Sequence, residues 1–267
     1  MTWIIGTPYV FGYGVLIGDV QVTDEDSGET YDAVMKIFPV CRGLIAGFAG
    51  NVELGFALIQ SLKDDYKFPD DTEKPLWYPE HLAENIPETL QKMYEKISKK
   101  TGKKFVHIII AGVDPRLESD MKVPYCYIFK SDENFSPYRI PRGKIESIGS
   151  GSTVTTYVDQ LEELQKGKTM AEFSQFEVHN TGGYARMLAH SIGDTLEKNP
   201  TQGISPHLFT VIVGTAEEPV VATNDRKYFT DPPIEFKMPE VAFSWMEFKK
   251  LINQLSGGTA NASACVC

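Results

Sequence analysis

The sequence predicts an α+β fold in which two antiparallel sheets pack together and helices cover both outer faces, a four-layer αββα sandwich. The predicted elements follow the order strands, two helices, strands, two helices, strands. Paired helices between runs of strands suit two packed sheets, whereas a doubly wound fold would alternate strands and helices one to one. The chain has 267 residues, 42% of them hydrophobic and 23% charged, which allows a sizeable core.

The first 50 residues are predicted to form β structure without a helix. Short apolar runs bounded by Gly, Pro and Asp predict strands at residues 3–6, 13–18, 33–40 and 43–48. The first two strands suit an antiparallel hairpin. The acidic residues 24–29 suit a solvated loop or the tip of a hairpin.

Helices and further strands are predicted beyond residue 50. Asn51 is a typical helix N-cap, and apolar residues recur after it at steps of three or four as far as Leu62. Similar spacing predicts helices at 86–97, from Ser152 to 164, and at 184–198. Strands are predicted at residues 105–112, 125–129, 145–148, 208–213 and 219–222. The first of these is apolar throughout, so we expect it to be buried on both faces.

Two regions are expected from this order. Residues 1–224 would form one domain, and residues 225–267 a C-terminal extension with a short helix near 244–255 and a flexible tail rich in Gly, Ala and Ser. The apolar helix faces at 52–62 and 86–97 suggest more apolar surface than one subunit can bury, which favours a closed ring of identical subunits.

Composition excludes several classes of function. The net charge of −10 argues against nucleic acid or an anionic membrane as the main partner. The sequence has no apolar run of about 18 residues and no signal-peptide pattern, so we expect a cytoplasmic protein. Cys41 and Cys126 are interpreted as small buried residues, and Cys265 and Cys267 as part of the tail rather than a prenylation site. The five His are scattered, and we expect neither a metal nor a cofactor.

Thr2 carries the chemistry that the sequence suggests most directly. A small second residue normally permits removal of the initiator Met, which would leave Thr2 with a hydroxyl and an α-amine on one residue. The hydroxyl can act as nucleophile, and the amine, with a reference pKa of about 8, can act as its base near neutral pH. Thr is also a common second residue in proteins that make no use of it.

Five short motifs in order support this interpretation. They follow Thr2 along the chain and are Gly18-Asp19, Lys36-Ile37-Phe38, the run at 45–50 that ends in Gly50, the strand end Ile110-Ala111-Gly112-Val113-Asp114, and the turn Ile148-Gly149-Ser150-Gly151-Ser152. Together they resemble the peptidase subunits of proteasomes, both the β type and the simpler bacterial peptidases that pair with an unfolding ATPase. These are N-terminal nucleophile hydrolases, and the resemblance spans residues 2–224.

The resemblance implies a role for each of five residues. Thr2 would be the nucleophile, and Lys36 would stabilise its alkoxide while Asp19 orients the Lys36 ammonium. Gly50 would offer its backbone N–H to the developing oxyanion at the start of a helix. Ser150 would hydrogen-bond the α-amine. The alternative for Asp19 and Lys36 is a solvated ion pair at strand ends. The alternative for Gly50 is a turn glycine, and for Ser150 it is an ordinary helix-entry turn.

The sequence departs from the family pattern after the fourth predicted helix. The family usually has an Asp there and a Ser three residues later, whereas this chain has Asn199-Pro200-Thr201-Gln202-Gly203. Asn199 can orient an amine but brings no charge.

The resemblance implies a threonine-type peptidase that acts on unfolded polypeptide inside a homo-oligomeric ring, and it allows for an ATPase unfoldase as partner. The alternatives are an inactive scaffold subunit of the same fold and a small-molecule amide hydrolase.

Overall fold

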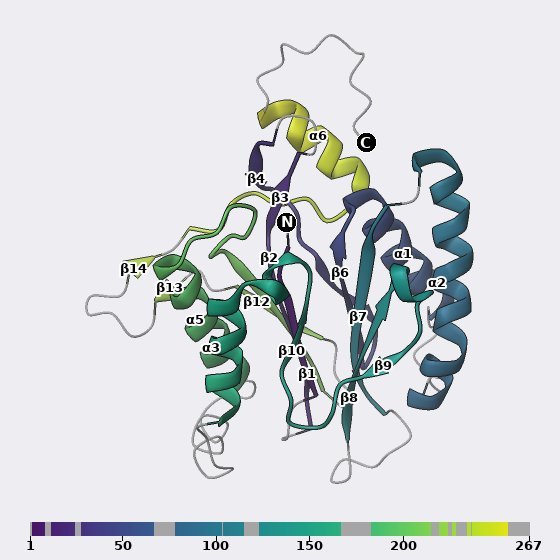
Figure 1. Cartoon of the computed structure of the whole chain (residues 1–267), viewed down its shortest axis with the longest axis horizontal. Helices are drawn as coiled ribbons and strands as arrows, with labels where there is room; N and C mark the ends of the chain where they lie inside the picture. The colour runs from purple at the N-terminus through teal and green to yellow at the C-terminus, as the bar shows by residue number, and fades with distance from the viewer. Residues whose placement is uncertain are drawn as a thin grey trace.

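The computed structural model describes residues 2–8, 12–24, 28–66, 78–102, 104–114, 123–166, 183–214, 219–223, 226–227, 234–235 and 237–255. These residues form five α-helices and antiparallel sheets (Figure 1), so the predicted α+β class is confirmed. The helices are α1 (Val52–Asp65), α2 (Pro79–Thr101), α3 (Thr155–Lys166), α5 (Gly183–Lys198) and α6 (Trp245–Leu255). None of these helices is long and apolar enough to cross a membrane.

The first five-stranded sheet has the strand order β10-β1-β2-β11-β12 and is antiparallel throughout. Its strands are β1 (Ile4–Pro8), β2 (Gly14–Asp19), β10 (Glu146–Ile148), β11 (Leu208–Val213) and β12 (Val220–Thr223). β1 and β2 form the predicted hairpin, with Ile5 opposite Ile17. Ile4 and Leu16 belong to one hydrophobic cluster, whereas Ile5 and Ile17 belong to a second. Since successive side chains of a strand point to opposite faces, both faces of this hairpin are buried.

The second five-stranded sheet has the order β5-β6-β7-β8-β9 and is also antiparallel. Its strands are β5 (Ile37–Cys41), β6 (Leu44–Gly50), β7 (Val106–Val113), β8 (Pro124–Lys130) and β9 (Tyr138–Arg139). All eight residues of β7 are buried, as its uninterrupted apolar run predicted. The described residues also form two short ribbons, β3 (Gln21–Thr23) with β4 (Thr30–Asp32) and β13 (Arg226–Lys227) with β14 (Ile234–Glu235).

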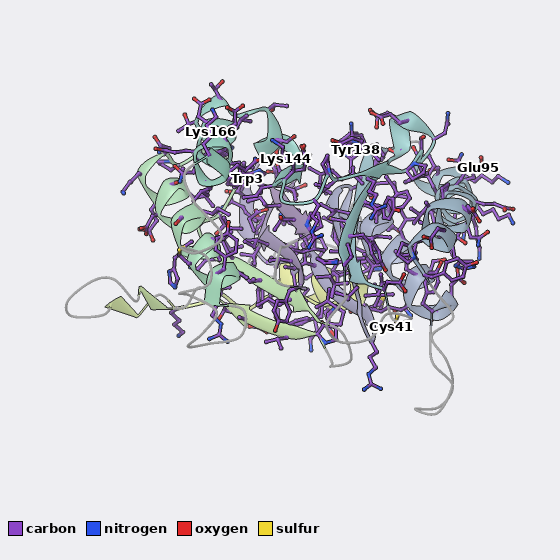
Figure 2. All side chains as sticks on the ribbon, turned by 90° about the horizontal axis from the view of Figure 1, so that it is seen from below. Trp3, Cys41, Glu95, Tyr138, Lys144 and Lys166 are labelled. Carbon is purple, nitrogen blue, oxygen red and sulfur yellow. The ribbon has the colours of Figure 1, made fainter. Side chains whose placement is uncertain are left out.

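The helices pack on the sheets in two groups. α1 contacts β5, β6 and β7 and also α2, whereas α5 contacts β11 and α3. Strands of the two sheets contact each other, among them β1 with β7 and β8. Figure 2 shows side chains filling the space between sheets and helices, while charged ones such as Glu95 and Lys166 lie on the outer sides of their helices. Asn51 caps α1 as predicted, because its side-chain oxygen accepts the Leu54 N–H at 3.1 Å.

The apolar faces of α1 and α2 are buried within the chain itself. Leu54, Leu58, Ile86 and Leu90 are each fully buried in the larger hydrophobic cluster. The expectation that these faces remain for another subunit was therefore wrong. Since burial of a helix's apolar stripe supplies most of its stability, the two helices need no partner to form.

The strand predicted at 33–40 begins later than expected. β5 starts at Ile37, and Val34 instead forms an isolated parallel bridge with Ala242. The Met35 N–H donates to the Ala242 carbonyl at 3.1 Å, and the Ala242 N–H donates to the Ala33 carbonyl at 2.7 Å. The backbone before Lys36 is thus bound by a segment more than 200 residues away, which local pattern could not reveal.

Two further predictions concern helix ends. The helix expected from Ser152 begins at Thr155, because residues Ser150–Thr153 form a short 3₁₀ helix and the Ser152 hydroxyl donates to the Gly149 carbonyl at 2.6 Å. The helix expected near 244–255 is confirmed as α6, whose Phe248 and Leu251 are buried in the larger cluster. The predicted tail after residue 255, with Cys265 and Cys267, lies outside the described residues.

Candidate active site

Thr2 lies two residues before the start of β1 and is held by the turn that follows β10. Its carbonyl oxygen accepts the Gly151 N–H at 3.2 Å, and its own N–H donates to the Ser150 hydroxyl at 2.9 Å. This nitrogen is a peptide nitrogen while Met1 is attached, and removal of Met1 would make it the α-amine. The structure therefore places Ser150 beside the nitrogen that the resemblance assigns to it. Thr2 is only 5% exposed.

The next residue fixes the direction of the chain at Thr2. The Trp3 ring is buried and stacks on Tyr157, with 4.7 Å between the ring centroids. Gly151 packs directly on the same indole, since a Cβ at Gly151 would lie 2.3 Å from Trp3 Cγ. The Trp3 N–H donates to Asp19 Oδ1 at 2.8 Å, and its carbonyl accepts the Asp19 N–H at 3.2 Å. Thr2 is thereby held at a fixed position relative to Asp19.

Asp19 and Lys36 form a buried ion pair beside this position. Lys36 Nζ lies 3.1 Å from each carboxylate oxygen of Asp19, and both side chains are almost completely inaccessible. The Lys36 ammonium also donates to the Gln21 carbonyl, and the Gln21 N–H donates to Asp19 Oδ2 at 3.0 Å. The alternative of a solvated strand-end pair does not hold, because neither group reaches water.

Burial moves both groups toward their neutral forms. Desolvation lowers the pKa of Lys36 below its ordinary value, although the charge and hydrogen bonds of Asp19 oppose this. Desolvation likewise raises the pKa of Asp19, against the charge of Lys36 and the backbone N–H of Trp3. A buried lysine whose pKa is shifted by desolvation and by a specific carboxylate partner is typical of a functional site.

A cavity of about 370 Å³ opens onto Thr2. It brings together three of the five predicted site residues, Thr2, Gly50 and Ser150. Its remaining walls come from β3, the start of α1, the segment before β7 and the turn before Ser150, and they are Val22, Thr23, Asn51, Val52, Lys104, Phe105 and Gly149. The walls are mostly apolar with a few polar groups, as is usual for a site that binds an organic ligand.

Gly50 occupies the end of β6 where α1 begins two residues later. Its φ of +104° is a conformation that L side chains rarely adopt, and a Cβ there would lie 2.3 Å from the Phe105 carbonyl oxygen. The Asn51 N–H donates to that same carbonyl at 2.9 Å. The positive end of the α1 dipole therefore lies at the cavity wall, where negative charge would be favoured.

Gly149 is a second glycine whose backbone the site requires. Its φ is +90°, and a Cβ there would lie 2.2 Å from the Thr2 carbonyl oxygen. Gly143 has a similar φ of +76° but open space around it. We expect Gly143→Ala to cost roughly 1 to 2 kcal/mol of unfolding free energy, as for any left-handed residue, and Gly149→Ala to cost about 3 kcal/mol or more.

Chemical denaturation of the two variants measures this difference. Because the displaced atom belongs to Thr2, Gly149→Ala should also impair any reaction at Thr2, whereas Gly143→Ala should not. Equal unfolding free energies for the two variants would show that Thr2 is not packed against Gly149.

Asn199, which stands where the family usually has an Asp, binds its own helix through its side chain. The Asn199 side-chain amide donates to the Thr195 carbonyl at 3.1 Å, in the last turn of α5, and the Asn199 carbonyl accepts the Tyr157 hydroxyl at 2.7 Å. Asn199 thus ends its own helix. Gln21, whose backbone binds both Asp19 and Lys36, is a further site residue that the motifs did not predict. The signal for it was local, since an Asp side chain often accepts the N–H two residues later.

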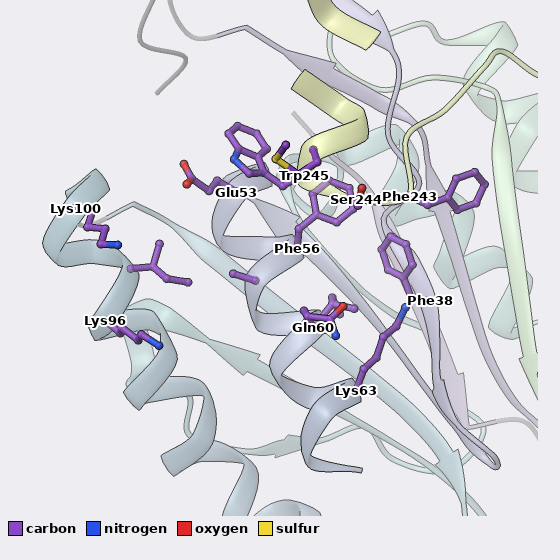
Figure 3. Close-up of a pocket in the computed structure, with 14 residues that line it drawn as sticks. Phe38, Glu53, Phe56, Gln60, Lys63, Lys96, Lys100, Phe243, Ser244 and Trp245 are labelled. Carbon is purple, nitrogen blue, oxygen red and sulfur yellow. The ribbon is translucent and has the colours of Figure 1, made fainter. Parts of the chain in front are cut away.

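A second cavity of about 410 Å³ lies away from Thr2, between α1, α2 and the start of α6 (Figure 3). Aromatic residues and lysines line it, among them Phe56, Trp245, Lys63 and Lys96. Its hydroxyl group, on Ser244, accepts the Glu247 N–H at 3.2 Å and so caps α6. Its lining does not include Thr2 or any other of the five predicted site residues.

Within the described ranges, no group of three or more His, Cys, Asp or Glu side chains is placed to hold a metal ion. A scan against protein-family models finds no match, and a search of the curated proteins finds no significant match. The function of the site therefore has to be argued from its own geometry.

Proposed function

We propose that this chain is a threonine-type peptidase subunit that cleaves peptide bonds through Thr2. The observation that carries the proposal is the position of Thr2. It faces a 370 Å³ cavity together with Gly50 and Ser150, and the adjacent residue Trp3 is bonded directly to a buried Asp19–Lys36 pair. A hydroxyl-bearing residue at a cavity, a nitrogen with a hydroxyl partner, and a buried cation whose carboxylate partner binds the next residue are the parts that acyl transfer needs.

The proposed reaction begins once Met1 has been removed. The Thr2 α-amine takes the hydroxyl proton, and Thr2 Oγ forms a bond to the carbonyl carbon of the substrate. The Lys36 ammonium stabilises the negative charge of the attacking oxygen, and Ser150 holds the amine. The Gly50 N–H and the positive end of α1 stabilise the oxyanion. The amine returns the proton to the leaving nitrogen, and water then hydrolyses the ester on Thr2.

The architecture that we propose for the catalytic unit is the four-layer αββα sandwich. In it, α1 and α2 cover the second sheet, α3 and α5 cover the first, and the inner faces of the two sheets meet. The contacts of α1 with β6, of α5 with β11 and of β1 with β7 support this arrangement. Residues 1–224 would form this unit, and residues 225–267 the extension. The cytoplasm is the compartment that we propose, since Cys41 and Cys126 are both thiols.

We further propose that identical subunits form a closed ring that admits unfolded polypeptide, with an ATPase unfoldase as a candidate partner. Apolar side chains that one subunit leaves exposed support association, and they include Phe105, Val220, Val221, Phe243 and Met246. Light scattering should give a mass that is a multiple of the 29.8 kDa subunit. A monomer across working concentrations would contradict the ring.

Two measurements on the purified protein test the peptidase proposal. Mass spectrometry of the N-terminus should show that Met1 has been removed and that Thr2 begins the chain. An electrophile that closes a ring with a hydroxyl and a neighbouring α-amine should then label Thr2 alone. A retained Met1 would block the amine and favour the inactive scaffold, and labelling at another residue would overturn the assignment of Thr2.

Assays with peptide substrates and with small amides distinguish the peptidase from the remaining alternative, an amide hydrolase. Hydrolysis of unfolded polypeptide supports the peptidase. Labelling of Thr2 together with hydrolysis of small amides alone would instead favour an amide hydrolase of the same fold.

A further inference from the structure

Asp32 is the centre of a polar cluster that Gln21 links to the Asp19–Lys36 pair. Oδ2 of Asp32 accepts the Ser205 hydroxyl at 2.7 Å and lies 2.8 Å from Nδ1 of His207. Oδ1 of Asp32 accepts the side-chain N–H of Gln21 at 3.0 Å. Ser205 is fully buried, and Asp32 and His207 are each largely buried.

Gln21 connects this cluster to the ion pair. Gln21 and Asp32 lie directly opposite each other in the β3–β4 ribbon. The side chain of Gln21 binds Asp32, its N–H binds Asp19 Oδ2 at 3.0 Å, and its carbonyl accepts the Lys36 ammonium. One residue therefore joins two carboxylates and the lysine by hydrogen bonds.

The segment that carries His207 is attached to the same place by its backbone. His207 directly precedes β11, whose first residue, Leu208, lies opposite Asp19 in the first sheet. The Ser205 hydroxyl accepts the His207 N–H at 3.1 Å, which closes a tight turn around the Asp32 carboxylate. The carboxylate is thus held from two directions, by β3 and by the residues before β11.

We infer that Asp32 is a positioning residue that holds Gln21 against the Asp19–Lys36 pair and favours the positive charge on Lys36. The importance of Asp32 for catalysis rests on the proposed function. The effect of Asp32 on Lys36 is independent of that function. The carboxylate supplies the second negative charge near Lys36 and anchors the residue whose carbonyl Lys36 binds. Neither interaction brings Asp32 into contact with the substrate, so it acts through Lys36.

The charges around the cluster are consistent with this role. Burial alone would raise the pKa of Asp32, but the hydrogen bonds from His207, Ser205 and Gln21 outweigh it and hold that pKa below its ordinary value. Asp32 is therefore charged at neutral pH. The carboxylates that act on Lys36 are Asp19 and Asp32, and both oppose the effect of burial on its pKa. In the proposed active form, the Thr2 α-amine would be a further charge at this site.

The Ser205, His207 and Asp32 side chains do not form a hydrolytic triad of their own. In such a triad the two ring nitrogens of the imidazole bind the carboxylate and the hydroxyl separately. Here the single nitrogen Nδ1 lies 2.8 Å from Asp32 Oδ2 and 3.0 Å from Ser205 Oγ, and the hydroxyl itself donates to the same Asp32 oxygen. Ser205 is also inaccessible to a substrate. The cluster therefore serves to hold the carboxylate.

The test measures the pKa of Lys36 directly, by NMR of the full-length protein with lysine labelled at the ε-carbon. Lys36→Met identifies the Lys36 signal. Asp32→Asn preserves the shape of the side chain but removes its charge, so the pKa of Lys36 should fall by about one unit. Glu29→Gln is the matched control, because it removes one carboxylate from the same ribbon at an exposed position. Asp32→Glu keeps the charge and should restore most of the wild-type value.

The outcomes distinguish a failure of this inference about Asp32 from a failure of the proposed peptidase function. A fall in the Lys36 pKa in Asp32→Asn but not in Glu29→Gln supports it, even if the protein cleaves no peptide. Equal pKa values in the wild type and Asp32→Asn overturn it, whether or not Thr2 is the nucleophile. If Asp32→Asn does not fold, Asp32→Ser carries the same expectation. In an active enzyme, the alkaline limb of kcat/KM should move to lower pH by the same amount, because the ammonium is the form required.

Discussion

Replacement of Thr2 by alanine is expected to abolish peptide hydrolysis while leaving the fold intact. The variant keeps the Asp19–Lys36 pair and, in the proposed mechanism, the α-amine and the oxyanion site, but it lacks the atom that would form the bond to the substrate. Removal of a nucleophile from a catalytic set that acts as a unit lowers kcat on the order of 10⁶-fold. The measurement is the rate of cleavage of an unfolded, fluorescently labelled polypeptide.

The structure explains why the fold should tolerate this change. The contacts that fix Thr2 include backbone bonds to Gly151 and Ser150, and its neighbour Trp3 is fixed by Asp19 and Tyr157. An alanine retains these backbone groups. The unfolding free energy and the oligomeric mass of Thr2→Ala should therefore match those of the wild type.

Two control variants show whether the loss of activity is specific to the hydroxyl of Thr2. Thr2→Ser keeps a hydroxyl at the same position and should retain measurable activity. Thr23→Ala removes a hydroxyl from the wall of the same cavity, and it should alter kcat/KM by less than about tenfold, the size expected for loss of an ordinary hydrogen bond. Full activity in Thr2→Ala, or equal losses in Thr2→Ala and Thr23→Ala, would rule Thr2 out as the nucleophile.

The elements that local sequence predicted well are those whose pattern repeats within the element. The apolar run of β7, the Asn51 cap of α1, the stripe of α5 and the helix α6 lie where periodicity and capping placed them. In each case the residues that define the element are neighbours in the chain. The periodicity of apolar side chains and the chemistry of helix caps were therefore enough to predict these elements.

The features that the sequence did not predict depend on residues far apart in the chain. The late start of β5 follows from the pairing of Val34 with Ala242, and Asp32 meets Ser205 only through the packing of the β3–β4 ribbon beside β11. The proximity of Asp19 and Lys36 came from the resemblance rather than from any pattern. The burial of Asp19 and Lys36 could not be predicted from the sequence, because charged side chains are usually exposed.

Loss of the Lys36 charge is expected to destabilise the protein strongly as well as inactivate it. Lys36→Met keeps most of the length and apolar volume of the side chain but leaves the Asp19 carboxylate buried without its cation. Breaking a buried ion pair in this way typically costs about 3 to 5 kcal/mol. The exposed pair of Lys92 and Glu88, on α2, provides the control, since both of its side chains are more than 70% accessible. Lys92→Met should scarcely move the denaturation midpoint.

The pH dependence of this destabilisation has a definite sign. In Lys36→Met the Asp19 carboxyl loses the charge that favoured its ionised form, so its pKa in the folded state rises further above the unfolded value of about 3.9. Between those two pKa values the folded state binds more protons than the unfolded state, and stability increases as the pH falls. The deficit of Lys36→Met relative to the wild type should thus be smaller at pH 5 than at pH 7.

A double variant separates the structural role of the pair from its chemical role. Asp19→Asn combined with Lys36→Met removes both charges, while the Asn oxygen can still accept the Trp3 N–H. Since a buried pair and its neutral replacement often differ little in stability, the double variant should recover at least about 2 kcal/mol relative to Lys36→Met. It should nevertheless remain inactive, because no ammonium is left to stabilise the attacking oxygen of Thr2. Additive losses in chemical denaturation would mean that the two charges are not coupled, and recovery of peptidase activity would show that Lys36 serves the fold alone.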